Sequence, residues 1–343
     1  MSGAAGRNLP AGLDRVRARR LLVDAPLVHF PLHPGDRALV EPGEVVQVGG
    51  PLLERARAAA AIAIAPGDVP AGARSGDWWT APGRRIGLRR GRAGVAAGEL
   101  LYEGEARWHA VVGDRTDVVE APVAGIVRAV RPGLGIALAT TAAGIPGSVA
   151  VGGPTRGRIE VAIVGDGELR SSAIDIHRAG AVVVGGARID AETITRARAM
   201  GVRGVVAGAV ASRELRDLAA SEARQRASLQ PIPPFAVLAL EGHARSPIAG
   251  PVAGLLAALA GRPVAIVADP PLLLVEGELG AVPLPPPDLV RVRSGPLAGT
   301  EGRWGGPAGR RRFEAGVVLE AGIVELEGGG SAVVPLADLE RFA

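Results

Sequence analysis

The chain has 343 residues, which is too long for one ordinary hydrophobic core and fits two or three domains of roughly 100–150 residues each. It contains no cysteine and no lysine, which excludes disulfides, thiolate nucleophiles, cysteine-bound zinc, Schiff bases and covalent attachment of biotin or lipoyl groups. All 39 basic residues are arginines, and the net charge of only +4 does not by itself establish a nucleic-acid-binding surface.

Residues 1–23 are predicted to form a basic N-terminal extension. This segment holds five arginines and no apolar stretch as long as the core of a secretory signal. Nowhere in the chain does an apolar run approach the ~20 residues that a membrane-spanning helix needs. We therefore expect a cytoplasmic protein without a membrane segment.

A β-rich domain is predicted over residues 24–159. Two distant segments, 43–51 and 147–154, share the pattern of a short apolar strand that enters a Gly-Gly-Pro turn. Together with residues 120–133, which alternate around a glycine bend, they resemble the barrel-sandwich hybrid of biotinyl and lipoyl carriers and of the Rnf electron-transport subunit. The resemblance implies two halves that pair with each other, with residues 57–117 as an excursion between them. Since no lysine is available for modification, we expect a scaffold or docking domain.

Aromatic and basic residues are concentrated in this excursion, where residues 78–98 contain no acidic side chain. The residues concerned are Trp78, Trp79, Arg84, Arg85, Arg89, Arg90 and Arg92. Arginines beside exposed aromatic rings are what base stacking and phosphate contact require, which predicts binding of single-stranded nucleic acid. The same residues also fit a tryptophan pair that covers the domain while the arginines lie in water. Both interpretations stay open.

Residues 160–275 alternate between apolar β-branched runs and helical patterns. Strands are expected at 161–164, 181–184, 202–207, 236–240 and 264–268, and helices near 172–179, 191–200, 213–226 and 248–260. Asp190 and Ser212 are the expected N-caps, and Gly180 and Gly201 the expected C-terminal glycines. Strands this apolar, each followed by a helix, predict a three-layer α/β domain with a mainly parallel sheet that is covered on both faces.

Domains of this kind bind ligands at the carboxyl ends of their parallel strands. The candidate residues there are Gly185, Gly186, Arg188, Gly208, Glu241 and His243. Glycines after a buried strand let backbone N–H groups approach an anion, and Arg188 adds positive charge, which predicts a site for a phosphorylated or otherwise anionic ligand. Glycines that only form tight turns are the alternative interpretation.

Catalysis has weaker support in the sequence. Glu241 and His243 have the chemistry of an acid–base pair, but such a pair arises by chance at the strand ends of many α/β sheets. No local spacing proposes a set of serine, histidine and carboxylate. We predict no catalytic residue, no cofactor and no metal.

Residues 276–287 are a proline-rich linker, and residues 288–343 show the most specific pattern in the chain. An alternating strand leads into the turn Gly-Pro-Leu-Ala-Gly-Thr-Glu-Gly at 295–302, and further strands follow. This pattern resembles the KOW motif of the NusG transcription elongation factors and of certain ribosomal proteins. The resemblance implies a small SH3-like β-barrel that binds RNA or protein.

The charge of residues 288–343 bears on the choice between these two partners. Seven arginines stand against eight carboxylates, which favours a protein partner. Arg310, Arg311 and Arg312 form a local basic cluster that reads either as a nucleic-acid contact or as a solvated turn. We therefore expect a non-enzymatic binding or scaffold protein associated with transcription, translation or ribonucleoprotein machinery. The alternative expectation is an enzyme or small-molecule sensor that binds an anionic ligand in the central domain.

Overall fold

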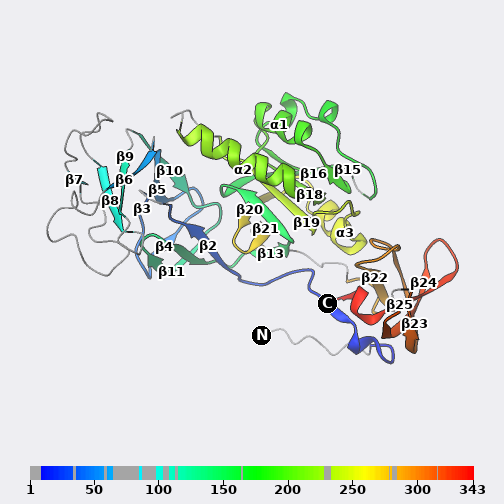
Figure 1. Ribbon diagram of the computed structural model, residues 1–343. Coiled ribbons are helices and arrows are strands. Elements are labelled where there is room, and N and C mark those ends of the chain that lie inside the picture. Colours follow the sequence, from blue (N-terminus) through cyan, green and yellow to red (C-terminus); the bar gives the residue numbers. More distant parts are fainter. Residues whose placement is uncertain are drawn as a thin grey trace.

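The computed structural model describes residues 9–33, 36–57, 60–64, 85–86, 98–102, 108–112, 115–163, 165–227, 233–277, 279, 284–314 and 316–343. Between 56 and 116, and from 224 to 227, only the backbone is described. The protein is mixed α/β and strand-rich, and none of the sheets in the described part of the chain closes into a barrel. The N-terminal sheets, the central helices and sheet, and the C-terminal sheet lie in a row (Figure 1).

Two small sheets form the N-terminal domain, with the strand orders β2-β12-β11-β4 and β10-β5-β3. Their strands are β2 (Leu27–Pro31), β3 (Arg37–Ala38), β4 (Val45–Val46), β5 (Pro51–Arg57), β10 (Arg115–Glu120), β11 (Gly125–Arg131) and β12 (Gly135–Ala139). Alternate residues of β2 and β12, such as Phe30 and its partner Ile136, point into one buried core. That core continues into β20 (Pro263–Ala268) and β21 (Pro271–Val275), so the N-terminal and central domains share one hydrophobic cluster.

The backbone of the excursion forms a separate antiparallel sheet with the order β6-β9-β8-β7. Its strands are β6 (Ala60–Ile64), β7 (Arg85–Ile86), β8 (Gly98–Tyr102) and β9 (Trp108–Val112). This sheet lies beyond the other N-terminal strands, at the end of the molecule away from the C-terminal sheet (Figure 1).

A nine-stranded sheet of mixed direction forms the central domain. Four neighbouring strands are parallel: β15 (Thr155–Ile163), β16 (Ala181–Gly185), β18 (Gly204–Val210) and β19 (Ala236–Gly242). β20 and β21 extend the sheet in antiparallel fashion beyond β15, and β17 (Arg188–Ile189) is a short addition to β18. All five residues of β16 and all seven of β18 are buried, as expected for strands that are covered on both faces.

The two edge strands of this sheet, β13 (Ala143–Pro146) and β14 (Val149–Gly152), follow each other along the chain. Only Gly147 and Ser148 separate them, a connection that spans at most ~11 Å, so the sheet curls until its edges come close. Residues 147–154 were expected to pair with 43–51 in the N-terminal domain. Instead, β14 pairs with β19, and the central domain begins at β13, ahead of residue 160.

Helices cover both faces of the central sheet. α1 (Ala191–Ala199) and α2 (Ser212–Ala227) pack on one face, and α3 (Gly250–Ala258) packs on the other. Asp190 caps α1 by accepting a hydrogen bond from the Thr193 amide at 2.8 Å, which agrees with the predicted N-cap. The helix expected at 172–179 is replaced by two 3₁₀ turns, η3 (Ser171–Ala173) and η4 (Ile176–Arg178), because Ile174 is extended and Asp175 caps a new turn.

The C-terminal sheet has six strands in the order β1-β26-β22-β23-β24-β25, and its edge strands β1 and β25 leave it open. Its elements are η1 (Leu13–Arg15), β1 (Arg17–Arg19), β22 (Leu289–Val292), β23 (Glu301–Arg312), β24 (Val318–Leu326), β25 (Ser331–Pro335), η5 (Leu336–Asp338) and β26 (Leu339–Phe342). β1 pairs with β26 in parallel, so the end of the predicted N-terminal extension belongs to this sheet. Figure 1 shows this segment crossing from the C-terminal sheet back to the N-terminal domain.

Residues of the N-terminal segment also fill the core of the C-terminal sheet. Leu13 and Val16 are almost fully buried in the cluster that contains Trp304. The indole N–H of Trp304 donates to the carbonyl oxygen of Ala11 at 3.1 Å. The C-terminal sheet is therefore completed by the other end of the chain.

We expect Leu13→Ala in the full chain to destabilise the C-terminal sheet by about 2–5 kcal/mol, the cost of removing a well-packed leucine. Hydrogen exchange of the β22 and β26 amides measures the change, and Asp14→Ala, at an exposed neighbouring residue, is the control. Equal protection in both variants would show that the Leu13 side chain does not stabilise the sheet.

Candidate functional site

The predicted glycines at the carboxyl ends of the strands are used for close packing. The Gly186 amide donates to the Ile163 carbonyl, and the Gly208 amide donates to the Gly186 carbonyl, both at 2.9 Å. A β-carbon on Gly186 would overlap the carbonyl oxygen of Gly167, and one on Gly208 would overlap that of Ser246. These two N–H groups are therefore committed to the backbone and do not form an anion cradle.

The other predicted residues at this edge do not converge on one point. Arg188 lies 3.5 Å from the Glu214 carboxylate, and Nδ1 of His243 lies 3.0 Å from the carbonyl oxygen of Val210. Glu241 turns instead toward the two ends of the chain. No hydrogen bond between Glu241 and His243 occurs among the described residues, so the structure does not assemble the acid–base pair.

Glu241 is the centre of a buried network of charges. The Arg19 guanidinium contacts both of its carboxylate oxygens, at 2.7 and 3.1 Å, and Nη1 of Arg291 lies 2.7 Å from Oε2. The Ala249 amide, at the start of α3, donates to Oε1 at 3.1 Å. Arg19 also contacts Glu340 at 3.1 Å. The network joins β19 of the central domain to β1, β22 and β26 of the C-terminal sheet.

A second carboxylate closes the same junction. Glu301, on β23, accepts a hydrogen bond at 2.7 Å from the amide of Gly250, the first residue of α3. A carboxylate at this end of a helix is stabilised by the helix dipole. Arg291 adds a hydrogen bond to Ser246 at 3.0 Å and a further one to the carbonyl oxygen of Pro247. The C-terminal sheet is thus held to the central domain by ionic and polar contacts and by the apolar side chains of Phe342 and Leu289, which pack against the central core.

Burial favours the neutral form of both carboxylates, but their pKa values shift in opposite directions because only Glu241 is held by two arginines. Burial would raise the pKa of Glu241, but the hydrogen bonds from Arg19 and the charge of Arg291 lower this pKa below its ordinary value. Burial alone would lower the pKa of Arg19, but its hydrogen bonds to Glu241 raise this pKa above its ordinary value. At Glu301 burial dominates and raises the pKa, despite the hydrogen bond from Gly250.

These shifts predict different pH dependences for two variants. The stability that Glu241 contributes is present above its unfolded pKa of about 4.3 and is lost as the pH falls through its lowered folded pKa. Glu241→Gln should therefore cost about 3–5 kcal/mol at pH 7 and weaken the loss of stability in acid.

The contribution of Glu301, whose folded pKa is raised, is present below about pH 4.3 and is lost as the pH rises through that folded pKa. Glu301→Gln is therefore expected to cost less than Glu241→Gln at pH 7. Urea unfolding between pH 3 and 8 compares the two variants. Equal effects at every pH would contradict the assignment of Glu241 as the central charge.

The other predicted binding residues fall into two groups. Trp78, Trp79, Arg84, Arg89, Arg90 and Arg92 lie outside the described residues, and of Arg85 only the backbone at the start of β7 is described. Nucleic-acid binding by this cluster stays a prediction. Arg310, Arg311 and Arg312 lie at the end of β23, and all three are exposed.

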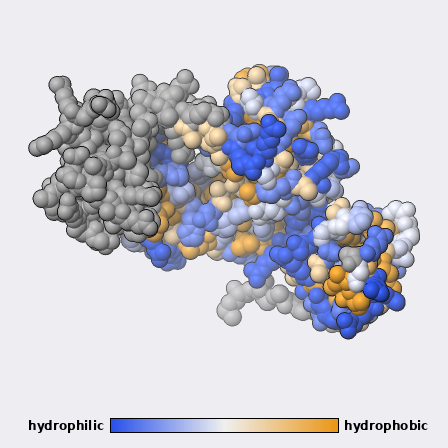
Figure 2. Space-filling view, in the orientation of Figure 1, coloured by the Kyte–Doolittle hydropathy of each residue, from blue (hydrophilic) through white to orange (hydrophobic). Residues whose placement is uncertain are grey.

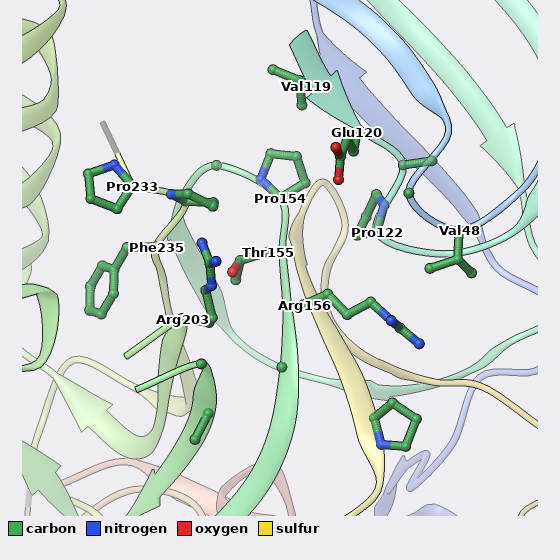
Figure 3. Close-up of a pocket in the computed structure, with 18 of the residues that line it drawn as sticks. Val48, Val119, Glu120, Pro122, Pro154, Thr155, Arg156, Arg203, Pro233 and Phe235 are labelled. Atoms are coloured by element: carbon green, nitrogen blue, oxygen red, sulfur yellow. The ribbon is translucent and has the colours of Figure 1, made fainter. Parts of the chain in front are cut away.

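A cleft of about 1040 Å³ lies at the opposite edge of the central sheet, at the amino ends of β15, β16, β18 and β19. Residues 117–122 of the N-terminal domain form its facing wall. Figure 3 shows Arg203 and Thr155 on the side of the central sheet and Glu120 across the cleft from them. Sequence reasoning missed this edge because ligands of α/β sheets are expected at the carboxyl ends of the strands.

Most arginines of the cleft already have partners. Arg55 lies 3.1 Å from Asp36, Arg156 lies 3.2 Å from Glu276, and Arg158 donates to the carbonyl oxygen of Gly261 at 3.1 Å. Arg203 differs from them, since no side-chain partner for it occurs among the described residues. The cleft therefore presents one guanidinium that is available to a ligand.

The chain matches no protein-family model, no curated protein and no solved structure. Within the described residues, none of the helices is both long and apolar enough to span a lipid bilayer. The same part of the chain contains no group of three or more histidine, aspartate or glutamate side chains arranged to hold a metal ion.

Proposed function

We propose that the protein is a non-enzymatic binding protein whose C-terminal sheet, a KOW-type SH3-like unit, docks on a protein of the transcription, translation or ribonucleoprotein machinery. The N-terminal domain, with two sheets and no lysine, serves as an unmodified scaffold similar to a barrel-sandwich hybrid. The observation that carries the proposal is the hairpin formed by the ends of β23 and β24, residues 309–320. We call this hairpin the arginine ribbon.

The arginine ribbon extends beyond the rest of its sheet. β22 pairs only with residues 301–303 of β23, and β25 pairs only with residues 321–325 of β24, so residues 309–320 have no third strand in the described part of the chain. A two-stranded ribbon is only marginally stable by itself. Its exposed apolar residues, Val317, Val318 and Leu319, are 51%, 45% and 37% exposed. A ribbon of this composition fits a surface that becomes covered by a partner.

Each face of the ribbon carries both an arginine and an apolar side chain. Arg311 is directly opposite Leu319, and Arg312 is directly opposite Val318. Residues that face each other across a strand pair share one face, and successive residues point to opposite faces. Each face thus combines a guanidinium with an exposed aliphatic side chain, a combination enriched in protein interfaces.

The charge of the whole segment argues for a protein over a nucleic acid. Residues 288–343 hold seven arginines and eight carboxylates, so no extended basic field attracts a polyanion. Figure 2 shows hydrophobic and hydrophilic residues side by side on the C-terminal sheet. The partner that fits the ribbon is a protein surface with an apolar centre and acidic residues around it.

Binding of the full-length protein to purified ribosomes and to purified multisubunit RNA polymerase tests the proposal. We expect the wild type to bind one of them. The triple variant Arg310→Glu, Arg311→Glu, Arg312→Glu should bind it roughly tenfold or more weakly, because like charges then face the acidic partner. Val318→Ser with Leu319→Ser should weaken binding while leaving its salt dependence unchanged.

The matched control is Arg213→Glu on α2, whose side chain is 85% exposed and lies in another domain. Failure of the wild type to bind either particle, or equal binding by the triple variant, would refute the proposal. Competition of this binding by a single-stranded RNA oligonucleotide would instead support the nucleic-acid interpretation of the arginine clusters.

A further inference from the structure

We propose that the cleft at the amino ends of the central strands binds a small molecule through one oxyanion, a carboxylate or a phosphate, held by Arg203 and Thr155. This site is separate from the arginine ribbon and from the predicted site at the carboxyl ends of the strands.

The backbone of Arg203 is fixed at the mouth of the cleft. Its amide donates to the Ala181 carbonyl at 2.8 Å, and its own carbonyl accepts from the Ala236 amide at 3.2 Å. The residue is therefore clamped between the beginnings of β16 and β19, immediately before β18. Its half-buried side chain points into the cleft (Figure 3). A guanidinium held on rigid strands binds an anion with little loss of conformational entropy.

Thr155 supplies the second observation. It is only 3% exposed, and its Oγ1 atom has no hydrogen-bond partner among the described residues. Thr155 and Arg203 both line the cleft on the side of the central sheet (Figure 3). A buried hydroxyl without a partner costs ~1–3 kcal/mol. Since a guanidinium is only a donor, a group that satisfies both side chains must be an acceptor, and an oxyanion accepts from both.

The rest of the cleft restricts the ligand further. Pro154 and Pro233 form rigid apolar walls near Arg203, and the buried Phe235 supports them from the core (Figure 3). The volume of about 1040 Å³ is at the upper end of the roughly 300–1,000 Å³ of small-molecule pockets. The carboxylates of Asp117, Glu120, Glu160 and Glu222, which also line the cleft, disfavour a second anionic group. The ligand class is therefore a small molecule with one anionic group, which binds near the apolar walls beside Arg203, and a nucleic-acid strand does not fit it.

Titration of the full chain, labelled with ¹⁵N, with sodium phosphate and separately with sodium acetate tests the proposal at constant ionic strength. The Arg203 Nε–Hε resonance should shift and saturate with at least one of them, and the anion that binds more tightly identifies the oxyanion. Acetamide, a neutral analogue of acetate, should produce no saturating shift. Thr155→Val should raise the dissociation constant about fivefold, the effect of one hydrogen bond.

Arg203→Gln should raise the same dissociation constant roughly tenfold or more, because a charge-assisted hydrogen bond is lost. In this variant the titration is followed through the backbone amide resonance of Thr155. The Arg213 side chain, exposed on α2, serves as the internal reference for non-specific ion binding. A linear shift at Arg203 that matches the shift at Arg213 would overturn the proposal, as would unchanged affinity in Thr155→Val. If Arg203→Gln does not fold, Thr155→Val alone still decides between the two outcomes.

Discussion

The carboxylate of Glu241 is the point at which the two ends of the chain meet the central sheet. It is buried with Arg291, whose side chain is 2% exposed, and it is held by Arg19 from the other end of the sequence. Removing a charge from water costs several kcal/mol, so the two arginines depend on the Glu241 carboxylate for compensation, and Glu241 depends on them. Removing Glu241 leaves the buried Arg291 without its carboxylate partner, whereas Arg19 still contacts Glu340. The network therefore fixes how the C-terminal sheet is attached and in which direction the arginine ribbon extends.

This attachment also explains why the carboxyl edge of the sheet is a poor ligand site. Glu241 is neutralised by arginines, and the glycine at 208 lies against the chain that leads into α3. The edge that usually carries function in an α/β domain is used here for assembly. At the opposite edge the N-terminal domain packs beside the strands without covering Arg203, which leaves a cleft there. The position of the attached domains thus decides which edge of the sheet is open to solvent.

Sequence reasoning succeeded where the signal is local. The buried strands at 181–184 and 236–240 and the Asp190 cap follow from apolar runs and capping chemistry within a few residues. Prediction from the sequence failed where two residues that are in contact lie far apart along the chain. Arg291 alternates between two valines and would be expected to face solvent, yet it is buried because Glu241 lies 50 residues away in sequence and in contact in space. The parallel pairing of residues 17–19 with 340–342 likewise leaves no local signature.

The arginine ribbon and the cleft lie on different domains, and their separation bears on whether binding at one affects the other. Coupling between sites requires an element that has two arrangements which both ligands distinguish. The strands between them, β16, β18 and β19, are buried on both faces and belong to two packed clusters. Densely packed strands of this kind do not offer a second arrangement of similar energy. The junction around Glu241 combines buried ion pairs with apolar packing of Phe342 and Leu289 against the core of the central domain. A ligand in the cleft would therefore influence the ribbon only by changing that junction, and otherwise the two sites bind independently.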